Sequence, residues 1–160
     1  MGFPESAMIA EQQGWGNQGR QTLADAYHIL KREWDGGNHE REVGLHLLFL
    51  SFYGLVEPQK FTGFREDEAT YRALRTTFEQ VHASFERPYA NDAEFLYVVG
   101  LIANMFAEWL GDAARWRQIA VDYRPRYRAL APAGLNPAVF TDRGAYGDYF
   151  RGHVQVADGY

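Results

Sequence analysis

The sequence predicts an all-α protein of five or six helices that are arranged as antiparallel hairpins. Three segments share one spacing, an aromatic residue followed by an aliphatic residue at i+3 and a second aromatic residue at i+7: Tyr27-Leu30-Trp34, Tyr71-Leu74-Phe78 and Trp116-Ile119-Tyr123. These positions lie on one stripe of an α-helix, so each triplet predicts a helix with one buried face. Two further segments, 43–56 and 95–110, are apolar on almost every side, which predicts two central helices.

The first half of the chain divides into three of these helices. The first covers about residues 21–34, and the glycines that follow it suit a left-handed closing residue. The second covers about residues 39–57 and stops at Pro58, which cannot continue a helix. The third begins after Asp67, whose side chain is a good N-cap, and runs to Phe85.

The second half predicts two or three more helices. The fourth covers about residues 92–110, and a tight turn leads into a fifth over 113–130. Pro125 lies inside the fifth helix and is expected to kink or split it. A sixth helix can start at Asn136-Pro137, because proline suits the first helical position, and would extend to Phe150.

The ends of the chain are expected to lie outside the helical domain, which is assigned to residues 20–152. Residues 1–19 hold Gly, Gln, Ser and Pro with few apolar side chains, which predicts a flexible arm. Residues 153–160 alternate enough to predict a short extended tail. The start has no basic and apolar leader, which favours a cytoplasmic protein. The apolar run 43–56 spans only about 21 Å as a helix, too short for a bilayer core of about 30 Å.

The helices also repeat in pairs. The second helix aligns with the fourth at an offset of 53 residues, and the third aligns with the fifth at an offset of 45. The turn at 110–112, the aromatic Trp116 and the later Pro132 resemble the motif of tetratricopeptide-type proteins over residues 94–132. This resemblance implies a helical-repeat stack that binds other proteins. The unit here is nearer the ~40–47 residues of HEAT-type repeats, and an irregular antiparallel bundle is the alternative arrangement.

Composition and charge narrow the functional classes. The chain of 160 residues is 46% hydrophobic and 16% aromatic, so it can bury a core as one domain. It has no cysteine, which excludes disulfides and thiolate metal sites. Its net charge is −5, with a balance of −6 over residues 66–112 and +3 over 113–160. This balance argues against nucleic-acid binding, which needs a basic surface over the whole domain.

One polar cluster is a candidate metal site. His39, Glu42 and His46 lie at i, i+3 and i+7 of the second predicted helix, so they can project from one face. Imidazole and carboxylate are metal ligands, and His28 or His82 from a neighbouring helix would complete the set. The alternative is a solvated first-turn pair of His39 and Glu42, with His46 at the edge of the core.

A second candidate site is the arginine-rich fifth helix. Arg117, Arg124 and Arg128 share one stripe, and Tyr127 lies beside them. Arginine binds carboxylates through a two-pronged fork and stacks on aromatic rings, so this face suits an acidic protein partner. The alternative is a solvated face whose arginines pair with the acids of residues 66–112.

No catalytic signature is present, so the sequence favours a non-enzymatic protein-interaction module without a cofactor. A protein partner with acidic groups is expected, and self-association of the chain is a further expectation. The alternatives are a metal-binding bundle or metal-dependent enzyme that uses His39, Glu42 and His46, and a regulator that binds a small molecule between the second and fourth helices.

Overall fold

The computed structural model describes residues 2–16, 20–156 and 160, and this part of the chain contains eight α-helices, two 3₁₀ helices and no strand. The α-helices are α1 (Glu5–Gly14), α2 (Leu23–Asp35), α3 (Arg41–Val56), α4 (Gln59–Thr62), α5 (Glu68–Phe85), α6 (Ala93–Phe106), α7 (Ala113–Leu130) and α8 (Gly144–Val156). The 3₁₀ helices are η2 (Ala107–Trp109) and η3 (Pro137–Phe140). The predicted all-α class is confirmed.

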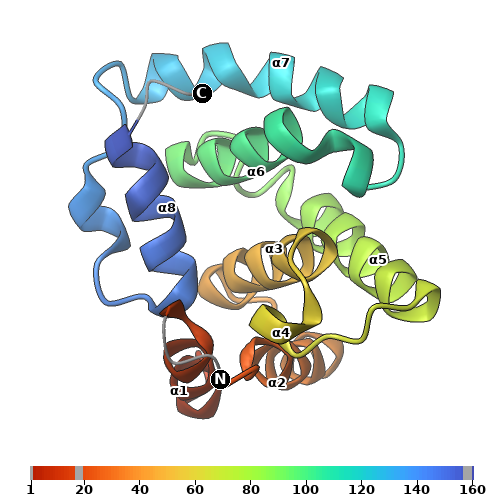
Figure 1. Cartoon of the computed structure of the whole chain (residues 1–160). Coiled ribbons are helices and arrows are strands. Elements are labelled where there is room, and N and C mark those ends of the chain that lie inside the picture. The colour runs from red at the N-terminus through yellow and green to blue at the C-terminus, as the bar shows by residue number, and fades with distance from the viewer. Residues whose placement is uncertain (1, 17–19, 157–159) are drawn as a thin grey trace.

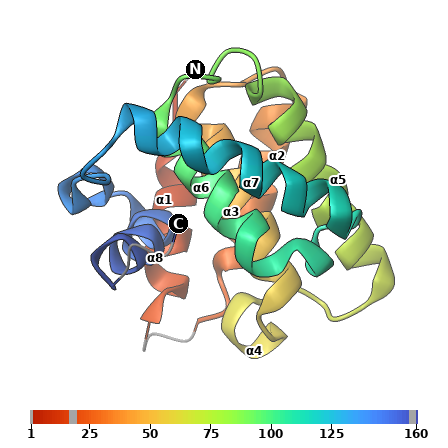
Figure 2. The ribbon, with the colours of Figure 1, turned by 90° about the horizontal axis from the view of Figure 1, so that it is seen from above.

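The helices are arranged around α3 and α6. The pairs α3–α5 and α6–α7 make the most extensive contacts, and α2 packs on the other side of α3. Figure 1 shows α7 lying along α6 at one edge of the molecule, with α1 and α2 at the opposite edge. Helix α8 contacts α1, α3 and η3, and in the view of Figure 2 it lies with α1 on one side of the α3–α6 centre. It therefore connects the two ends of the helix array.

The central helices are buried on almost every side. In α3 every residue from Val43 to Phe52 is buried, and in α6 every residue from Glu94 to Ala103. Of the nine aromatic and aliphatic residues in the repeated spacing, only Tyr71 and Ile119 are half-buried rather than buried. The spacing therefore marks core packing, as predicted.

The predicted number of five or six helices is wrong, because residues 1–19 contain a helix where an arm is expected and the short helix α4 follows Pro58. Helix α1 buries the small side chains Ala7 and Ala10 together with Glu11, and it packs on α2 and α8. Its apolar face consists of alanines, which carry little hydrophobic signal in a sequence. Residues 17–19 of the predicted arm lie outside the described residues.

The later helices also differ from the prediction. Pro125 does not split the fifth helix, since α7 continues through it from Ala113 to Leu130. The predicted sixth helix is instead two elements, η3 and α8, separated by a turn at Thr141–Arg143. Helix α8 extends to Val156, so the first part of the predicted extended tail is helical. Residues 157–159 of that tail lie outside the described residues.

Within the described residues, none of the helices has both the length and the apolar character needed to cross a bilayer.

Replacing Gly44 by Ala is expected to destabilise the contact between α3 and α5. A Cβ atom at this position would lie 2.1 Å from Cζ of Phe85, whose ring is buried. Overpacking of this kind typically costs about 1–3 kcal/mol of the free energy of unfolding. Chemical denaturation would measure the loss. Gly152→Ala is the matched control, because nothing lies within 4 Å of a Cβ placed there.

Candidate functional site

The first candidate site is a slot between α6 and α7 that holds the side chain of Tyr160. The slot residues are Gly100, Ala120, Arg124, Tyr127 and Arg128, and we call them the tyrosine slot. Only 3% of Tyr160 is exposed, although it follows the end of α8 and its contacts lie 32 to 60 positions earlier in the chain. The slot thus buries a side chain from a distant segment.

The hydroxyl end of the Tyr160 ring is enclosed by the backbones of both helices. Its Oη donates a hydrogen bond of 2.5 Å to the carbonyl oxygen of Ala120 in α7. On the α6 side, a Cβ atom at Gly100 would lie 2.1 to 2.2 Å from Cε1, Cζ and Oη of the ring. Only glycine at position 100 allows the ring to reach this depth.

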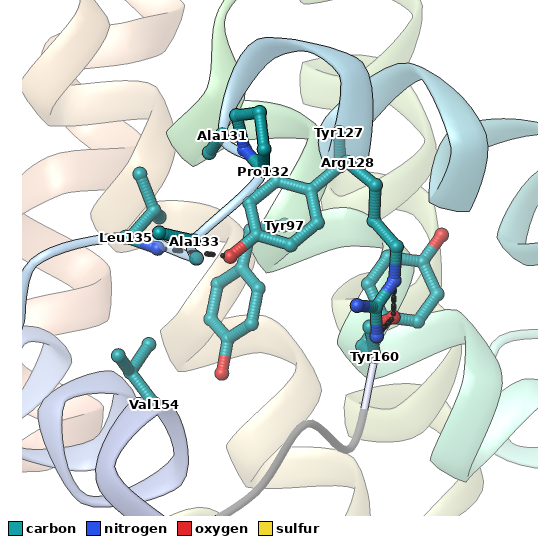
Figure 3. Close-up of a pocket in the computed structure, with 10 residues that line it drawn as sticks. Tyr97, Tyr127, Arg128, Ala131, Pro132, Ala133, Leu135, Val154 and Tyr160 are labelled. Atoms are coloured by element: carbon teal, nitrogen blue, oxygen red, sulfur yellow. Dashed lines mark hydrogen bonds between the residues drawn. The ribbon is translucent and has the colours of Figure 1, made fainter.

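Three side chains of α7 hold the rest of Tyr160. The guanidinium of Arg124 lies 5.1 Å from the ring centroid, a cation–π distance, and the ring of Tyr127 is stacked at 6.3 Å with an interplanar angle of 19°. Nε and Nη2 of Arg128 donate hydrogen bonds of 3.1 and 2.7 Å to the carbonyl oxygen of Tyr160. Figure 3 shows this fork of Arg128 on the Tyr160 backbone. The slot therefore contacts both the ring and the main chain of Tyr160.

A cavity of about 220 Å³ adjoins the slot. Tyr97, Tyr127, Val154 and the loop 131–135 line it together with Arg128 and Tyr160, as Figure 3 shows for the labelled residues. The Tyr127 hydroxyl accepts a hydrogen bond of 3.1 Å from the Leu135 backbone, which fixes one wall. The cavity is smaller than the roughly 300–1,000 Å³ of typical small-molecule sites.

The second candidate site is a group of charged side chains at the junction of α1, α3, α6 and α8, which we call the ionic cluster. Its members are joined by hydrogen bonds and ion pairs: Glu11, Arg41, Glu42, His46, Asp92, Glu94, Arg143 and Tyr146. Four carboxylates thus face two arginines and one histidine. The cluster is complete as a network only when His46 is protonated.

His46 lies at the centre of the ionic cluster and is completely buried. Its Nδ1 lies 2.5 Å from Oε2 of Glu11, and its Nε2 lies 2.9 Å from Oε1 of Glu42. Burial by itself would lower the pKa of His46, but the two carboxylates outweigh burial and raise it to about 9. Burial would likewise raise the pKa of Glu42, but hydrogen bonds from His46 and Arg143 lower it to about 2. Both groups are therefore charged at neutral pH.

Arg143 and Arg41 connect this centre to α6. Arg143 donates to both carboxylate oxygens of Glu42, at 2.9 and 2.6 Å, and its Nη1 lies 2.6 Å from Oε1 of Glu94. Arg41 bonds the second oxygen of Glu94 at 2.8 Å and both oxygens of Asp92, the N-cap of α6, at 2.7 and 3.0 Å. The ionic cluster ties the starts of α3, α6 and α8 together.

The three predicted metal ligands do not form one group, because only Glu42 and His46 are in contact. His39 stacks on Trp34 at 3.9 Å, and its Nε2 lies 3.0 Å from the Trp34 carbonyl oxygen, whereas Glu42 and His46 belong to the ionic cluster. His82 bonds Tyr123 instead, at 2.8 Å, and His28 is exposed. In the part of the chain that the structure describes, no group of three or more His, Cys, Asp or Glu side chains is arranged to hold a metal ion.

The predicted partner-binding residues divide into two sets. Arg124, Tyr127 and Arg128 come together in the tyrosine slot, whereas Arg117 forms a surface ion pair with Glu108. Sequence reasoning missed Gly100, Ala120 and Tyr160. One signal was present, since a glycine inside the strongly apolar segment 95–110 marks a place where another group approaches the helix closely.

A larger cavity of about 580 Å³ lies on the surface between α2 and α5, lined mainly by Tyr27, His28, Ala69, Ala73 and neighbouring polar residues. One alternative from the sequence analysis is a small molecule bound between the second and fourth predicted helices, which correspond to α3 and α6. The cavity between α2 and α5 lies elsewhere. Small-molecule binding stays a prediction.

Comparisons with known proteins identify no relative of this chain. No protein-family model matches the chain, and no similar protein was found among the curated proteins or the solved structures. The resemblance to tetratricopeptide-type repeats therefore stays a prediction.

Proposed function

We propose that this protein is a non-enzymatic helical module that binds a segment of a protein partner in the tyrosine slot. The observation that carries the proposal is the burial of Tyr160 against residues of two other helices. Peptide segments are commonly held by a buried side-chain anchor together with hydrogen bonds to their backbone. Tyr160 makes both kinds of contact, since its ring is buried and its main chain accepts hydrogen bonds from Arg128. We take it as the model for how a partner segment would bind.

The charge around the slot supports a partner with acidic groups. Residues 113–160 carry a net charge of +3, and the slot itself presents the guanidinium groups of Arg124 and Arg128. Complementary charge speeds association and disfavours wrong partners. The ionic cluster offers no competing site, because His46 and Glu11 are completely buried and out of reach of a substrate.

A protein without the Tyr160 side chain in its slot is expected to bind an added peptide there. The peptide VQVADGY has the sequence of residues 154–160, and Tyr160→Ala removes the internal anchor. We expect this peptide to bind the Tyr160→Ala protein with a dissociation constant on the order of 0.1 mM, as is reasonable for one anchor residue. Fluorescence anisotropy of the labelled peptide would measure it.

Two arginines of α7 provide the test of the site. Arg128→Ala, made in the Tyr160→Ala protein, removes the fork on the peptide backbone and is expected to weaken binding by about tenfold or more. Arg117→Ala is the matched control, since Arg117 lies on the same helix but pairs with Glu108. Equal loss in the two variants, or no binding to the emptied slot, would contradict the proposal.

A further inference from the structure

We infer that the tyrosine slot selects an unmodified tyrosine in an acidic partner segment, and that Tyr160 is the internal competitor for that segment. This inference rests on the proposed function and adds the identity of the anchor residue. It also predicts that phosphorylation of the anchor abolishes binding.

The first reason for the selectivity is the atom that faces the hydroxyl. The carbonyl oxygen of Ala120 is a hydrogen-bond acceptor, so the slot favours a ligand with a donor, which a tyrosine hydroxyl supplies and a phenylalanine ring does not. A phosphate group on that oxygen would replace the donor by anionic oxygens facing a carbonyl oxygen. Electrostatic repulsion therefore opposes the modified residue.

The shape of the slot gives a second, independent reason. A single Cβ atom at Gly100 would already lie 2.2 Å from the hydroxyl oxygen, so no space remains on the α6 side for a phosphate. The ring is 3% exposed, which means that the hydroxyl end points into the protein rather than out of the slot. Charge attraction to Arg124 cannot compensate, because its guanidinium lies against the ring at 5.1 Å from the centroid.

The rest of the recognition does not depend on the partner's sequence. Arg128 binds the main-chain oxygen of Tyr160, a contact that does not involve a side chain of the bound segment. The ring contact thus sets the anchor, and the arginines favour acidic neighbours. Residues that precede Tyr160 in the sequence fit this description, since Asp158 is two positions before it.

Tyr160 lies in the same chain as the slot, so it competes at a high effective concentration. A segment that is joined to its binding site through a short stretch of chain has an effective concentration of about 1 mM. With a peptide dissociation constant on the order of 0.1 mM, the unaltered protein would bind an added peptide about tenfold more weakly than the Tyr160→Ala protein. A natural partner must therefore displace Tyr160.

The experiment compares four forms of the labelled peptide VQVADGY: unmodified, Tyr160→Phe, Tyr160→Ala and phosphorylated on the tyrosine. Anisotropy is measured with the Tyr160→Ala protein. We expect about fivefold weaker binding for the Phe form, from the loss of one hydrogen bond, and at least about a hundredfold weaker binding for the phosphorylated and Ala forms. Gly100→Ala in the same protein should block the unmodified peptide, and Gly152→Ala should not.

The outcomes separate the two proposals. Binding of the phosphorylated or Phe form as tight as that of the unmodified form overturns the selectivity but leaves the proposed function standing. Failure of every form to bind overturns both. The same ranking measured with the unaltered protein, shifted about tenfold to weaker binding, needs no substitution and so does not depend on how Tyr160→Ala folds.

Discussion

The Arg143→Met protein is expected to lose about 3–5 kcal/mol of its free energy of unfolding. Arg143 neutralises Glu42 and Glu94, and its side chain is only 16% exposed. Methionine has a similar length but no charge, so two carboxylates at the junction of α3, α6 and α8 would lose their shared cation. Glu42 keeps its contact with His46 and Glu94 keeps its contact with Arg41, but four carboxylates then share only these two cations, and uncompensated buried charge is costly.

Thermal denaturation followed by circular dichroism would measure this loss as a fall in Tm of roughly 10–15 °C. Arg151→Met is the matched control, since Arg151 lies on α8 but is exposed. Arg143→Lys should recover part of the loss, because an ammonium keeps the charge but cannot bond both oxygens of Glu42 and also Glu94. Equal stability of the two Met variants would show that the ionic cluster contributes nothing to the fold.

The helices could be predicted from the sequence because their signals are local. The aromatic spacing places Leu30, Phe78 and Trp116 on buried faces, and all three are buried. Helix α1 could not be predicted in this way, because its buried face is made by Ala7, Ala10 and Glu11, and the last is a charged residue. A buried glutamate has meaning only together with its partner His46, which is 35 positions away.

The candidate sites could be predicted only in part, for the same reason. Arg124, Tyr127 and Arg128 are close in sequence, so their common face follows from the helical period. Tyr160 lies 32 positions beyond Arg128, and nothing local in the sequence indicates that the two meet. For His39, Glu42 and His46 the sequence predicts a grouping that the structure does not contain. Helical spacing places them near one face, but His39 precedes the first residue of α3 and stacks on Trp34 instead.

Raising the pH from 6.5 to 9 is expected to weaken the fold through His46. The pKa of this group is about 9 in the folded chain and about 6.5 in the unfolded chain, so the folded state holds a proton that the unfolded state has lost between these values. A raised pKa contributes stability that is fully present below the unfolded value and disappears as the pH rises through the folded value. The free energy of unfolding should therefore fall by roughly 1 kcal/mol per pH unit over this window, to a total of a few kcal/mol.

Glu42 gives the opposite dependence at acidic pH. Its pKa is lowered to about 2, so its contribution is present above the unfolded value of about 4.5 and is lost as the pH falls toward 2. The two groups together predict a stability maximum between about pH 5 and pH 6.5. This maximum arises from one pair of neighbouring residues, since His46 and Glu42 are joined by the 2.9 Å contact.

Urea denaturation at half-unit steps from pH 3 to pH 9.5 would measure this profile. The His46→Gln protein shows whether His46 causes the decline in the free energy of unfolding. It has no imidazole at this position, so it should be less stable at pH 6 but should lack the decline between pH 6.5 and 9. His28→Gln is the control, because His28 is exposed on α2 and its replacement should leave the slope unchanged. A decline that persists unchanged in the His46→Gln protein would mean that His46 is not held as a cation by Glu11 and Glu42.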